Sequence, residues 1–330
     1  MLGEINKIAG VEPLTEGPGD AVTGDVPAAL AAALFGPVGG QEPRTYALID
    51  GARFPGAAEH LEDAGLLHRS FFKGQALADL GDAGPWLAAL PESGTFLRRL
   101  MTSGEAPWHF WDRGAVLYLR SGRDFDGLWS HLRKFTRMPG ENGRSAFFRY
   151  WEPRLWEVFA ARSGKLAALD EAFGRIFGGA QVILPALRLG GAFRFGWPPA
   201  DPRVDWPAGL RADLRRARFY DQMFAQAADF HDSYPVETAR YGDNPRDLLA
   251  PLFAAVDEVM DAGLSDPALR ARFLLLGIIK HDRTWPAILR EPSWARVRDG
   301  IGATDDRFRD LCALIKRGQA SFAPAGGAWW

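Results

Sequence analysis

Asp50 and Gly51 directly follow a short apolar segment, the position where an α/β enzyme keeps a catalytic acid. Asp before Gly is also ordinary turn chemistry, because both residues adopt the backbone conformations that tight turns need, and we favour this structural interpretation. The glycine clusters at 36–40 and 190–196 do not match phosphate-binding loops, because the first precedes a predicted strand and the second lacks both the spacing and a following helix. A Gly-x-Ser-x-Gly elbow is absent from the sequence. We therefore predict that the protein is not an enzyme.

Two His-Asp dipeptides, His231-Asp232 and His281-Asp282, suggest a different chemistry. Such pairs help to bind divalent metal in helical metal-dependent phosphohydrolases, so an enzyme of this type, or another α/β enzyme, is the alternative function. His231, however, falls on an apolar stripe, where a core histidine with satisfied hydrogen bonds is more common. The histidines show no i, i+4 zinc spacing, and the lone Cys312 has no cysteine partner. The sequence thus predicts no metal site and no cofactor.

Aromatic and basic residues are the remaining candidates for function. The twelve tryptophans are a high count, and aromatic and arginine side chains are over-represented at protein interfaces. We expect roughly three quarters of the tryptophans in cores, given the area that each can bury. The charged residues of the 149–154 segment form either a binding cluster or an ion-pair network that holds a strand to its helix, and we favour the network. The candidate partner-binding residues are Trp108, Trp111, Arg149, Trp151, Glu152 and Arg154.

Composition narrows the possible partners. A formal net charge of −2 and a pI near 6.3 give no electrostatic case for nucleic acid or an anionic membrane. The sequence has neither an apolar signal region in its first 25 residues nor a run of the roughly 18 apolar residues that a membrane span needs. Cys312 is expected to be a small buried hydrophobe, which suits a reducing compartment. We therefore expect a cytoplasmic protein without membrane contact.

The first 200 residues alternate between strand-length apolar runs and helical patterns. We predict strands at 45–50, 66–72, 115–120 and 145–150, a helix at 27–35, short helical pieces in 75–107 and a hairpin over 182–197 that turns at Gly190-Gly191. The helix after residue 124 has the clearest periodicity, with apolar residues at i, i+3, i+4, i+7 and i+10. Strand, helix and strand between 115 and 150 predict a right-handed parallel crossover.

The pattern changes after a Pro-rich linker, beyond which we predict only helices. The expected fold is α/β (α+β), with a small mixed or parallel sheet flanked by helices in the N-terminal lobe and an all-helical C-terminal lobe. The predicted parts are a flexible tail (1–26), an α/β domain (27–197), the linker (198–207), the helical lobe (208–318) and a C-terminal tail (319–330) that ends in Trp329 and Trp330.

Six segments of the N-terminal half resemble, in order and spacing, the signature segments of one family. They are YALIDGAR (46–53), RSFFKG (69–74), PWLAALP (85–91), LYLRS (117–121), LRKF (132–135) and FRYWEPR (148–154). The family is the domain of unknown function found in type VI secretion effector chaperones, also called adaptor (Tap or TEC) proteins, and the resemblance covers about 27–165. One departure is Glu152, where the family usually has Asp before Pro. The signature residues that we expect to be structural are Asp50, Gly51, Arg53, Gly74, Pro85 and Pro153.

The resemblance implies a cytoplasmic, non-enzymatic adaptor. Such proteins bind a cognate toxic effector, often through its N-terminal region, and help to load it onto a VgrG-type spike. A chaperone of this kind must present apolar surface when it is free. We therefore expect an exposed apolar patch, or a groove between the lobes, that takes up a partner segment as an added strand or as a helix.

Overall fold

The computed structural model describes residues 3–16, 24–38, 42–140, 144–199, 206–279 and 290–316. The chain divides into two compact units, 1–217 and 218–330. The division falls inside helix α8 (Leu210–Ser233) and not in the predicted linker, of which 200–205 lie outside the described residues.

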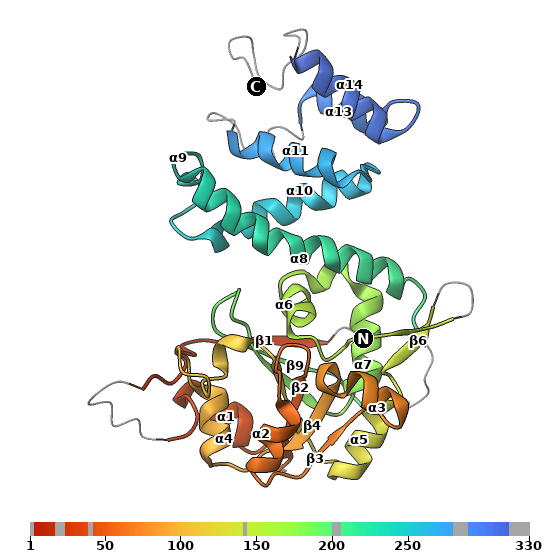
Figure 1. The fold of residues 1–330 in the computed structure, drawn as a ribbon. Helices are drawn as coiled ribbons and strands as arrows, with labels where there is room; N and C mark the ends of the chain where they lie inside the picture. Colours follow the sequence, from red (N-terminus) through yellow and green to blue (C-terminus); the bar gives the residue numbers. More distant parts are fainter. Residues whose placement is uncertain are drawn as a thin grey trace. The chain divides into compact units, whose positions relative to one another are not determined.

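A seven-stranded sheet forms the centre of the first unit (Figure 1). In spatial order its strands are β1 (Glu4–Ile8), β9 (Ala192–Gly196), β8 (Gln181–Pro185), β5 (Val116–Ser121), β2 (Arg44–Asp50), β4 (Pro85–Ala89) and β3 (His68–Ser70). The central strands β2 and β5 are almost wholly buried, which explains why they read as continuous apolar runs in the sequence. The α+β fold class is therefore confirmed, and the 182–197 hairpin is found as β8 and β9.

Strand direction differs from our expectation of a mixed or parallel sheet. Each pair of neighbouring strands in the described sheet is antiparallel. The crossover predicted between 115 and 150 was wrong, because β5 pairs with β2 and β8, whereas β7 (Ser145–Phe147) pairs with β6 (Arg137–Pro139) in a separate two-stranded ribbon. A helix between two short apolar runs indicates a crossover only if both runs join the same sheet, and local sequence does not reveal that.

Two strands of the seven-stranded sheet, β4 and β1, were not predicted. The leucines at 77, 80, 87 and 90 suggested helical pieces, yet 85–89 form β4 between β2 and β3. Pro85 is the first residue of β4, a position where proline is tolerated in a strand. The segment 1–26 was predicted to be a flexible tail, but Glu4–Ile8 pair along their length with β9 as edge strand β1. The Gly3 amide also donates to the Asp170 carboxylate at 3.2 Å, which ties this strand to helix α7 (Ala167–Phe177).

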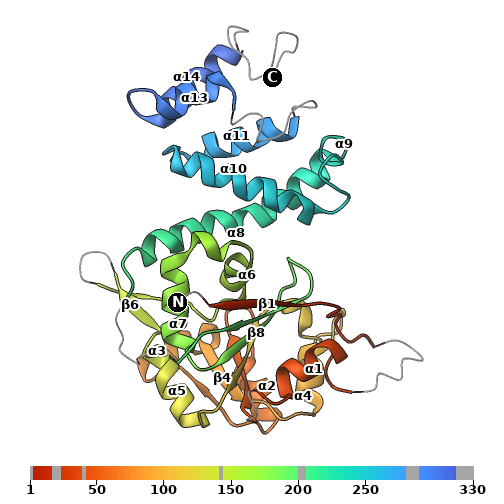
Figure 2. The same ribbon diagram turned by 180° about the vertical axis from the view of Figure 1, so that it is seen from behind.

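Helices cover both faces of the sheet (Figure 2). One core contains alternate β2 residues such as Ala47 and Ile49 with α1 (Ala28–Phe35), α2 (Ala57–Asp63) and α4 (Thr95–Met101). The opposite face meets α5 (Phe125–Arg133), α6 (Pro153–Arg162) and α7 (Ala167–Phe177), as the Tyr46–Phe125 ring contact at 6.3 Å shows. Trp156 of α6 stacks on Phe173 of α7 with ring centroids 4.2 Å apart. Even-numbered β2 residues, Asp50 among them, therefore face the α5–α7 layer.

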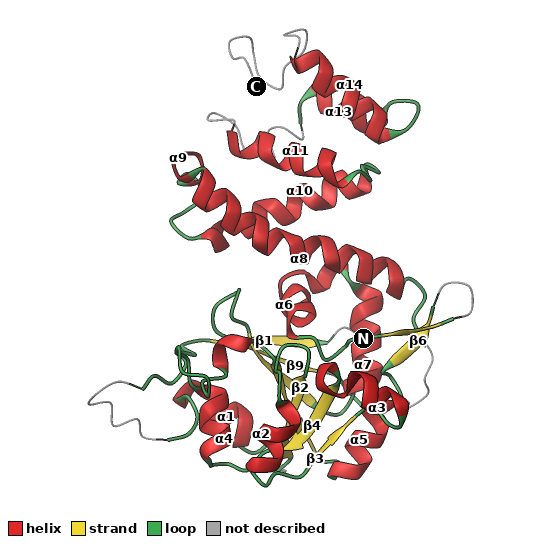
Figure 3. Cartoon of the chain, in the orientation of Figure 1, coloured by secondary structure: helices red, strands yellow, loops and turns green. Residues whose placement is uncertain are grey.

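The second unit is helical throughout its described residues, as predicted (Figure 3). It contains the rest of α8, then α9 (Pro235–Thr238), α10 (Leu249–Asp261), α11 (Pro267–Ile279), α13 (Pro292–Asp299) and α14 (Thr304–Lys316). Phe273, Trp294 and Phe308 form a buried aromatic cluster with ring centroids 4.5 to 6.0 Å apart. Cys312 is free and buried, as predicted, and burial raises the pKa of its thiol.

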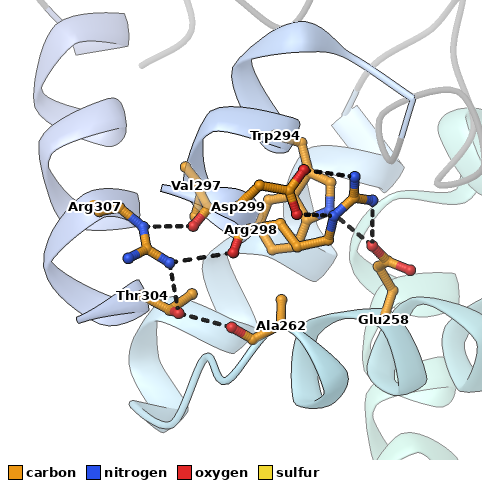
Figure 4. A network of polar contacts seen from close by, with 8 residues as sticks. All are labelled: Glu258, Ala262, Trp294, Val297, Arg298, Asp299, Thr304 and Arg307. Atoms are coloured by element: carbon orange, nitrogen blue, oxygen red, sulfur yellow. Dashed lines mark hydrogen bonds and ion pairs between the residues drawn. The ribbon is translucent and has the colours of Figure 1, made fainter. Parts of the chain in front are cut away.

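A polar network joins three helices of this unit (Figure 4). Arg298 of α13 pairs with the neighbouring Asp299 at 2.8 Å and with Glu258 of α10 at 3.2 Å. The Trp294 indole donates to the same Glu258 carboxylate at 3.2 Å. Hydrogen bonds from Arg298 hold the pKa of Asp299 below its usual range. The network fixes the orientation of α13 on α10.

Arg307 of α14 provides the second half of this network (Figure 4). Its guanidinium donates to the backbone carbonyls of Val297 at 2.6 Å and Arg298 at 3.3 Å, and also to Gly302 O. The Thr304 hydroxyl accepts from Arg307 at 3.0 Å and donates to Ala262 O at 2.7 Å. Arg307 therefore satisfies carbonyls at the C-terminal end of α13 that no intrahelical amide reaches.

Candidate functional site

Asp50, the last residue of β2, lies at the centre of a charged cluster. Its side chain is fully buried, and one guanidinium nitrogen of Arg149 donates to both carboxylate oxygens at 3.1 and 2.9 Å. Burial raises the pKa of Asp50, while the Arg149 charge opposes the rise. The Asp50 carboxylate is therefore held in an ion pair inside the first unit and does not project into open space as a catalytic acid would.

The turn after Asp50 depends on glycine for a steric reason. A Cβ on Gly51 would lie 2.4 Å from Asp82 O and 2.5 Å from Gly84 O. The Gly51 amide also donates to Gly84 O at 3.1 Å, so the turn is in close contact with the chain that leads into β4. These contacts give Gly51 a structural role in the turn.

Arg53 extends the cluster toward β5. Its guanidinium donates to Arg113 O and Gly114 O at 3.0 to 3.3 Å, and these two residues immediately precede Ala115 and β5. Burial and the Arg154 charge lower the pKa of Arg53. Arg53 thus connects the turn after β2 to the entry of β5.

The 149–154 segment contributes the other side of the cluster. Glu152 is the N-cap residue of α6 without making a side-chain cap hydrogen bond, and its carboxylate lies 3.9 Å from Arg149 Nε. Asp is a preferred N-cap residue. Glu152, with its longer side chain, makes the ion-pair contact with Arg149 and no cap hydrogen bond. Pro153 is buried in the first turn of α6, and Arg154 is exposed.

The hairpin loop before β9 meets the same helix. Glu157, which is 4% exposed, accepts from the Arg188 amide at 2.8 Å and pairs with the Arg188 guanidinium. The guanidinium also donates to Arg154 O at 3.2 Å. The cluster therefore contains four arginines and three carboxylates, and the sequence had indicated only part of it.

The tryptophan candidates differ in exposure. Trp108 is 47% exposed, whereas Trp111 and Trp151 are buried. The Trp151 indole nitrogen finds no acceptor among the described residues. Among the three tryptophan candidates, all of which are described, only Trp108 is exposed.

Gly74 and Pro85 both have local roles. Gly74 has φ of 56°, a region that residues with a Cβ rarely adopt, and it precedes helix α3 (Gln75–Leu80). Pro85 pairs with Asp50 in the β2–β4 register, and its carbonyl accepts from the Phe71 amide at 3.0 Å.

The structure also brings together a basic and aromatic surface that we did not predict. Arg69, Lys73 and Arg133 lie over the Trp129 ring at 4.8, 4.6 and 5.7 Å. The sequence signal was the set of basic residues in 69–73 and 133–137, but local sequence does not indicate that these two segments meet.

Two hollows lie away from Asp50, near the first residues of β2 and β3 and the last residues of β4. One, of about 530 Å³, is lined by apolar residues such as Leu67 and Phe125 together with Glu42, Arg44 and Glu92. The other, of about 380 Å³, is lined in part by His60, Asp63 and Arg99. Both lie within the size range of ligand pockets, but each mixes acidic and basic groups.

His231 is the histidine candidate that lies within the described residues. His231 Nε2 contacts Asp243 O at 3.1 Å, and Asp232 lies 3.7 Å from its other ring nitrogen. Across the described ranges, no three His, Cys, Asp or Glu side chains are grouped as metal ligands. His281 and Asp282 lie outside the described residues. Among the helices that are described, none is long and apolar enough to cross a membrane.

Comparison with known families adds one match. Residues 45–165 match the model of a family described as a domain of unknown function (DUF4123). All six segments of the resemblance lie inside this range, as do Asp50, Arg53, Arg149 and Glu152. No curated protein and no solved structure matches the chain.

Proposed function

We propose that this protein is a non-enzymatic adaptor that binds a cognate type VI secretion effector and helps to load it onto a VgrG-type spike. The observation that carries the proposal is the match of 45–165 to the same domain family that the six sequence segments resemble. That family is associated with type VI secretion effector chaperones. The proposed partners are the effector, often through its N-terminal region, and the spike protein, in the cytoplasm.

The charged cluster supports this proposal over that of an α/β enzyme. Asp50 occupies the position of a catalytic acid, but it is buried and both of its oxygens accept hydrogen bonds from Arg149. Glu157 is likewise buried, and its two oxygens accept from the Arg188 amide and the Arg188 guanidinium. These residues stabilise the junction of β2, α6 and the β8–β9 hairpin.

Exposed apolar side chains agree with a binding function. Trp108 is 47% exposed, Leu67 56%, and Leu77, Leu80 and Phe147 between 40% and 43%. An adaptor needs such side chains on its surface when it is free, because aromatic and apolar anchors supply most of the free energy at interfaces.

Co-purification tests the proposal directly. The full-length chain carrying an affinity tag would be co-expressed with the effector and spike proteins encoded next to its gene, and the expected result is stable capture of the effector. Trp108→Ala should weaken capture if Trp108 is an anchor, with Val236→Ala in the second unit as the exposed control. Failure to capture either neighbour would refute the adaptor function.

A further inference from the structure

Helix α3 (Gln75–Leu80) buries none of its residues in the protein. Leu77 and Leu80 are three positions apart, so they lie on one helix face, and they are 40% and 43% exposed. A surface helix normally turns such a face toward a core. The apolar face of α3 is therefore uncovered.

Phe72 connects this helix to the β6–β7 ribbon. Its ring lies 5.4 Å from that of Phe147, which is 43% exposed on β7. On the other side, the Phe72 ring lies against Gly84, where an added Cβ would be 2.6 Å from it and 3.3 Å from Leu80 O. Phe72 thus lies between Phe147 of the ribbon and the turn that follows α3.

Cations lie over aromatic rings at fixed positions. Lys73 and Arg133 lie over the Trp129 ring at 4.6 and 5.7 Å, and Arg137 lies over Phe147 at 4.7 Å. The Trp129 indole is itself held by a 3.0 Å hydrogen bond to Ser70 O. We refer to Lys73, Leu77, Leu80, Arg133, Arg137 and Phe147 as the α3 shelf.

The charge of the α3 shelf is not neutralised within the protein. Arg69 beside it pairs with Asp126 at 2.8 Å, but Lys73, Arg133 and Arg137 have no carboxylate partner among the described residues. Asp79 on α3, which accepts from Gln75 at 2.6 Å, and Asp82 in the turn after it are the carboxylates of this segment, and neither is paired with the three cations in the described part of the chain. Complementarity therefore favours an occupant that combines carboxylates with apolar side chains.

We propose that the α3 shelf binds an acidic amphipathic segment of a partner protein. Its apolar side chains pack on the exposed leucines and phenylalanine, and its carboxylates pair with the three cations. The inference deepens the proposed function and rests on it in assigning this segment to the protein that the adaptor carries. A protein segment is favoured over a lipid surface because the cations are ordered over aromatic rings, which suits carboxylates at defined spacing.

Fluorescence anisotropy with the full-length chain tests the α3 shelf. The probes are two labelled synthetic peptides with leucines at helical spacing, one with glutamate and one with lysine at its polar positions. The acidic peptide should bind at least about tenfold more tightly, which is about 1.4 kcal/mol. Its affinity should also fall as salt rises, because the cations are at the surface. Equal affinity for the two peptides would overturn the inference.

Paired substitutions separate the contribution of the cations to peptide binding from that of the apolar side chains. Lys73→Glu with Arg137→Glu should abolish the preference for the acidic peptide, and Leu77→Ser with Leu80→Ser should weaken its binding by about tenfold. The leucine variants should melt like the wild type, because α3 buries none of its residues. The controls are Lys165→Glu and Val236→Ser, which are both exposed and are not part of the α3 shelf. Equal effects of shelf and control variants would contradict the proposal.

Other occupants give different results. Binding to phosphatidylserine–phosphatidylcholine vesicles that is lost with the charge reversals, without peptide selectivity, would replace the proposal with a membrane surface. Self-association lost with the leucine variants, again without peptide binding, would assign the α3 shelf to a second copy. Effector capture that survives all shelf variants would refute this inference alone. Selective peptide binding without capture of any neighbouring protein would refute the adaptor function alone.

Discussion

Arg149 donates from one nitrogen to both carboxylate oxygens of Asp50, across 99 residues of sequence. The Asp50 side chain is completely buried, whereas the Arg149 side chain is 43% exposed. The cation therefore keeps part of its hydration while it compensates a carboxylate that has lost all of it. This asymmetry decides how the pair responds to mutation and to pH.

Removing Arg149 alone should lower the free energy of unfolding by more than removing the charges of both Arg149 and Asp50. Arg149→Ala leaves a buried carboxylate without its cation, so we expect a loss of about 2 kcal/mol in the free energy of unfolding. Asp50→Asn with Arg149→Ala should be less destabilised than the sum of the single variants, with a coupling of about 1 kcal/mol. Urea denaturation of the four proteins measures this cycle, and strict additivity would show that the pair is not coupled.

The pH dependence of Asp50→Asn should have a definite sign. Burial raises the pKa of Asp50 in the folded protein, so the folded state holds this proton more tightly than the unfolded state. This bound proton stabilises the folded protein at pH values below the pKa of Asp50 in the unfolded state, which is about 4. The stabilisation is lost as the pH rises through the pKa of Asp50 in the folded state. The Asn variant should therefore gain stability relative to the wild type as the pH rises from about 4 toward neutrality. A stability difference that is constant over this range would contradict the prediction.

Gly51→Ala should be strongly destabilising, because the new methyl group would overlap two carbonyl oxygens of the chain before β4. We expect a loss of about 2 kcal/mol or more. Gly122→Ala is the matched control, since its added Cβ has no atom within 4 Å. Thermal unfolding of both variants measures the difference, and equal melting temperatures would argue against the close approach at Gly51.

Replacement by alanine should affect stability strongly at Trp156 and very little at Trp108. Trp156 is fully buried, stacks on Phe173 and donates to Tyr150 O at 2.6 Å. Trp156→Ala should cost about 3–5 kcal/mol. Trp108→Ala, at an exposed position, should change stability by less than about 0.5 kcal/mol, so that any loss of partner capture reports binding. Chemical denaturation followed by circular dichroism measures both.

Arg307→Ala should destabilise the second unit, because three backbone carbonyls lose their donor. The expected loss is about 1–3 kcal/mol. Arg309→Ala is the control, since this side chain is 54% exposed and forms surface ion pairs with Asp266 and Asp306, which are worth about 0–1 kcal/mol. Hydrogen exchange of α13 and α14 should rise for Arg307→Ala only, and similar protection in both variants would exclude the capping role.

Local sequence was sufficient where neighbouring residues decide the structure. The apolar spacing from Phe125 predicted α5, and Gly190-Gly191 predicted the turn between β8 and β9, where both glycines have positive φ. The change to helical periodicity after the linker likewise predicted the helices of the second unit. Each of these features depends on backbone preferences and on burial patterns within a few turns of chain.

The strand pairing could not be obtained in this way. Residues 4–8 form strand β1 because they pair with β9, which is more than 100 residues away in the sequence. Residues 145–147 stay outside the central sheet because they pair with β6 in a short ribbon. Edge strands such as β1 bury only part of their side chains, so their sequence pattern is weak.

The sequence by itself determined the α+β class, the helical character of the second unit and the residues that carry charge and aromatic rings. Only the tertiary structure decided that Asp50 is paired with Arg149, that Trp111 is buried while Trp108 is not, and that basic residues of two segments meet over Trp129. The physical reason is that charge pairing and exposure depend on which distant segments come into contact. Periodicity records only which face of each element is apolar.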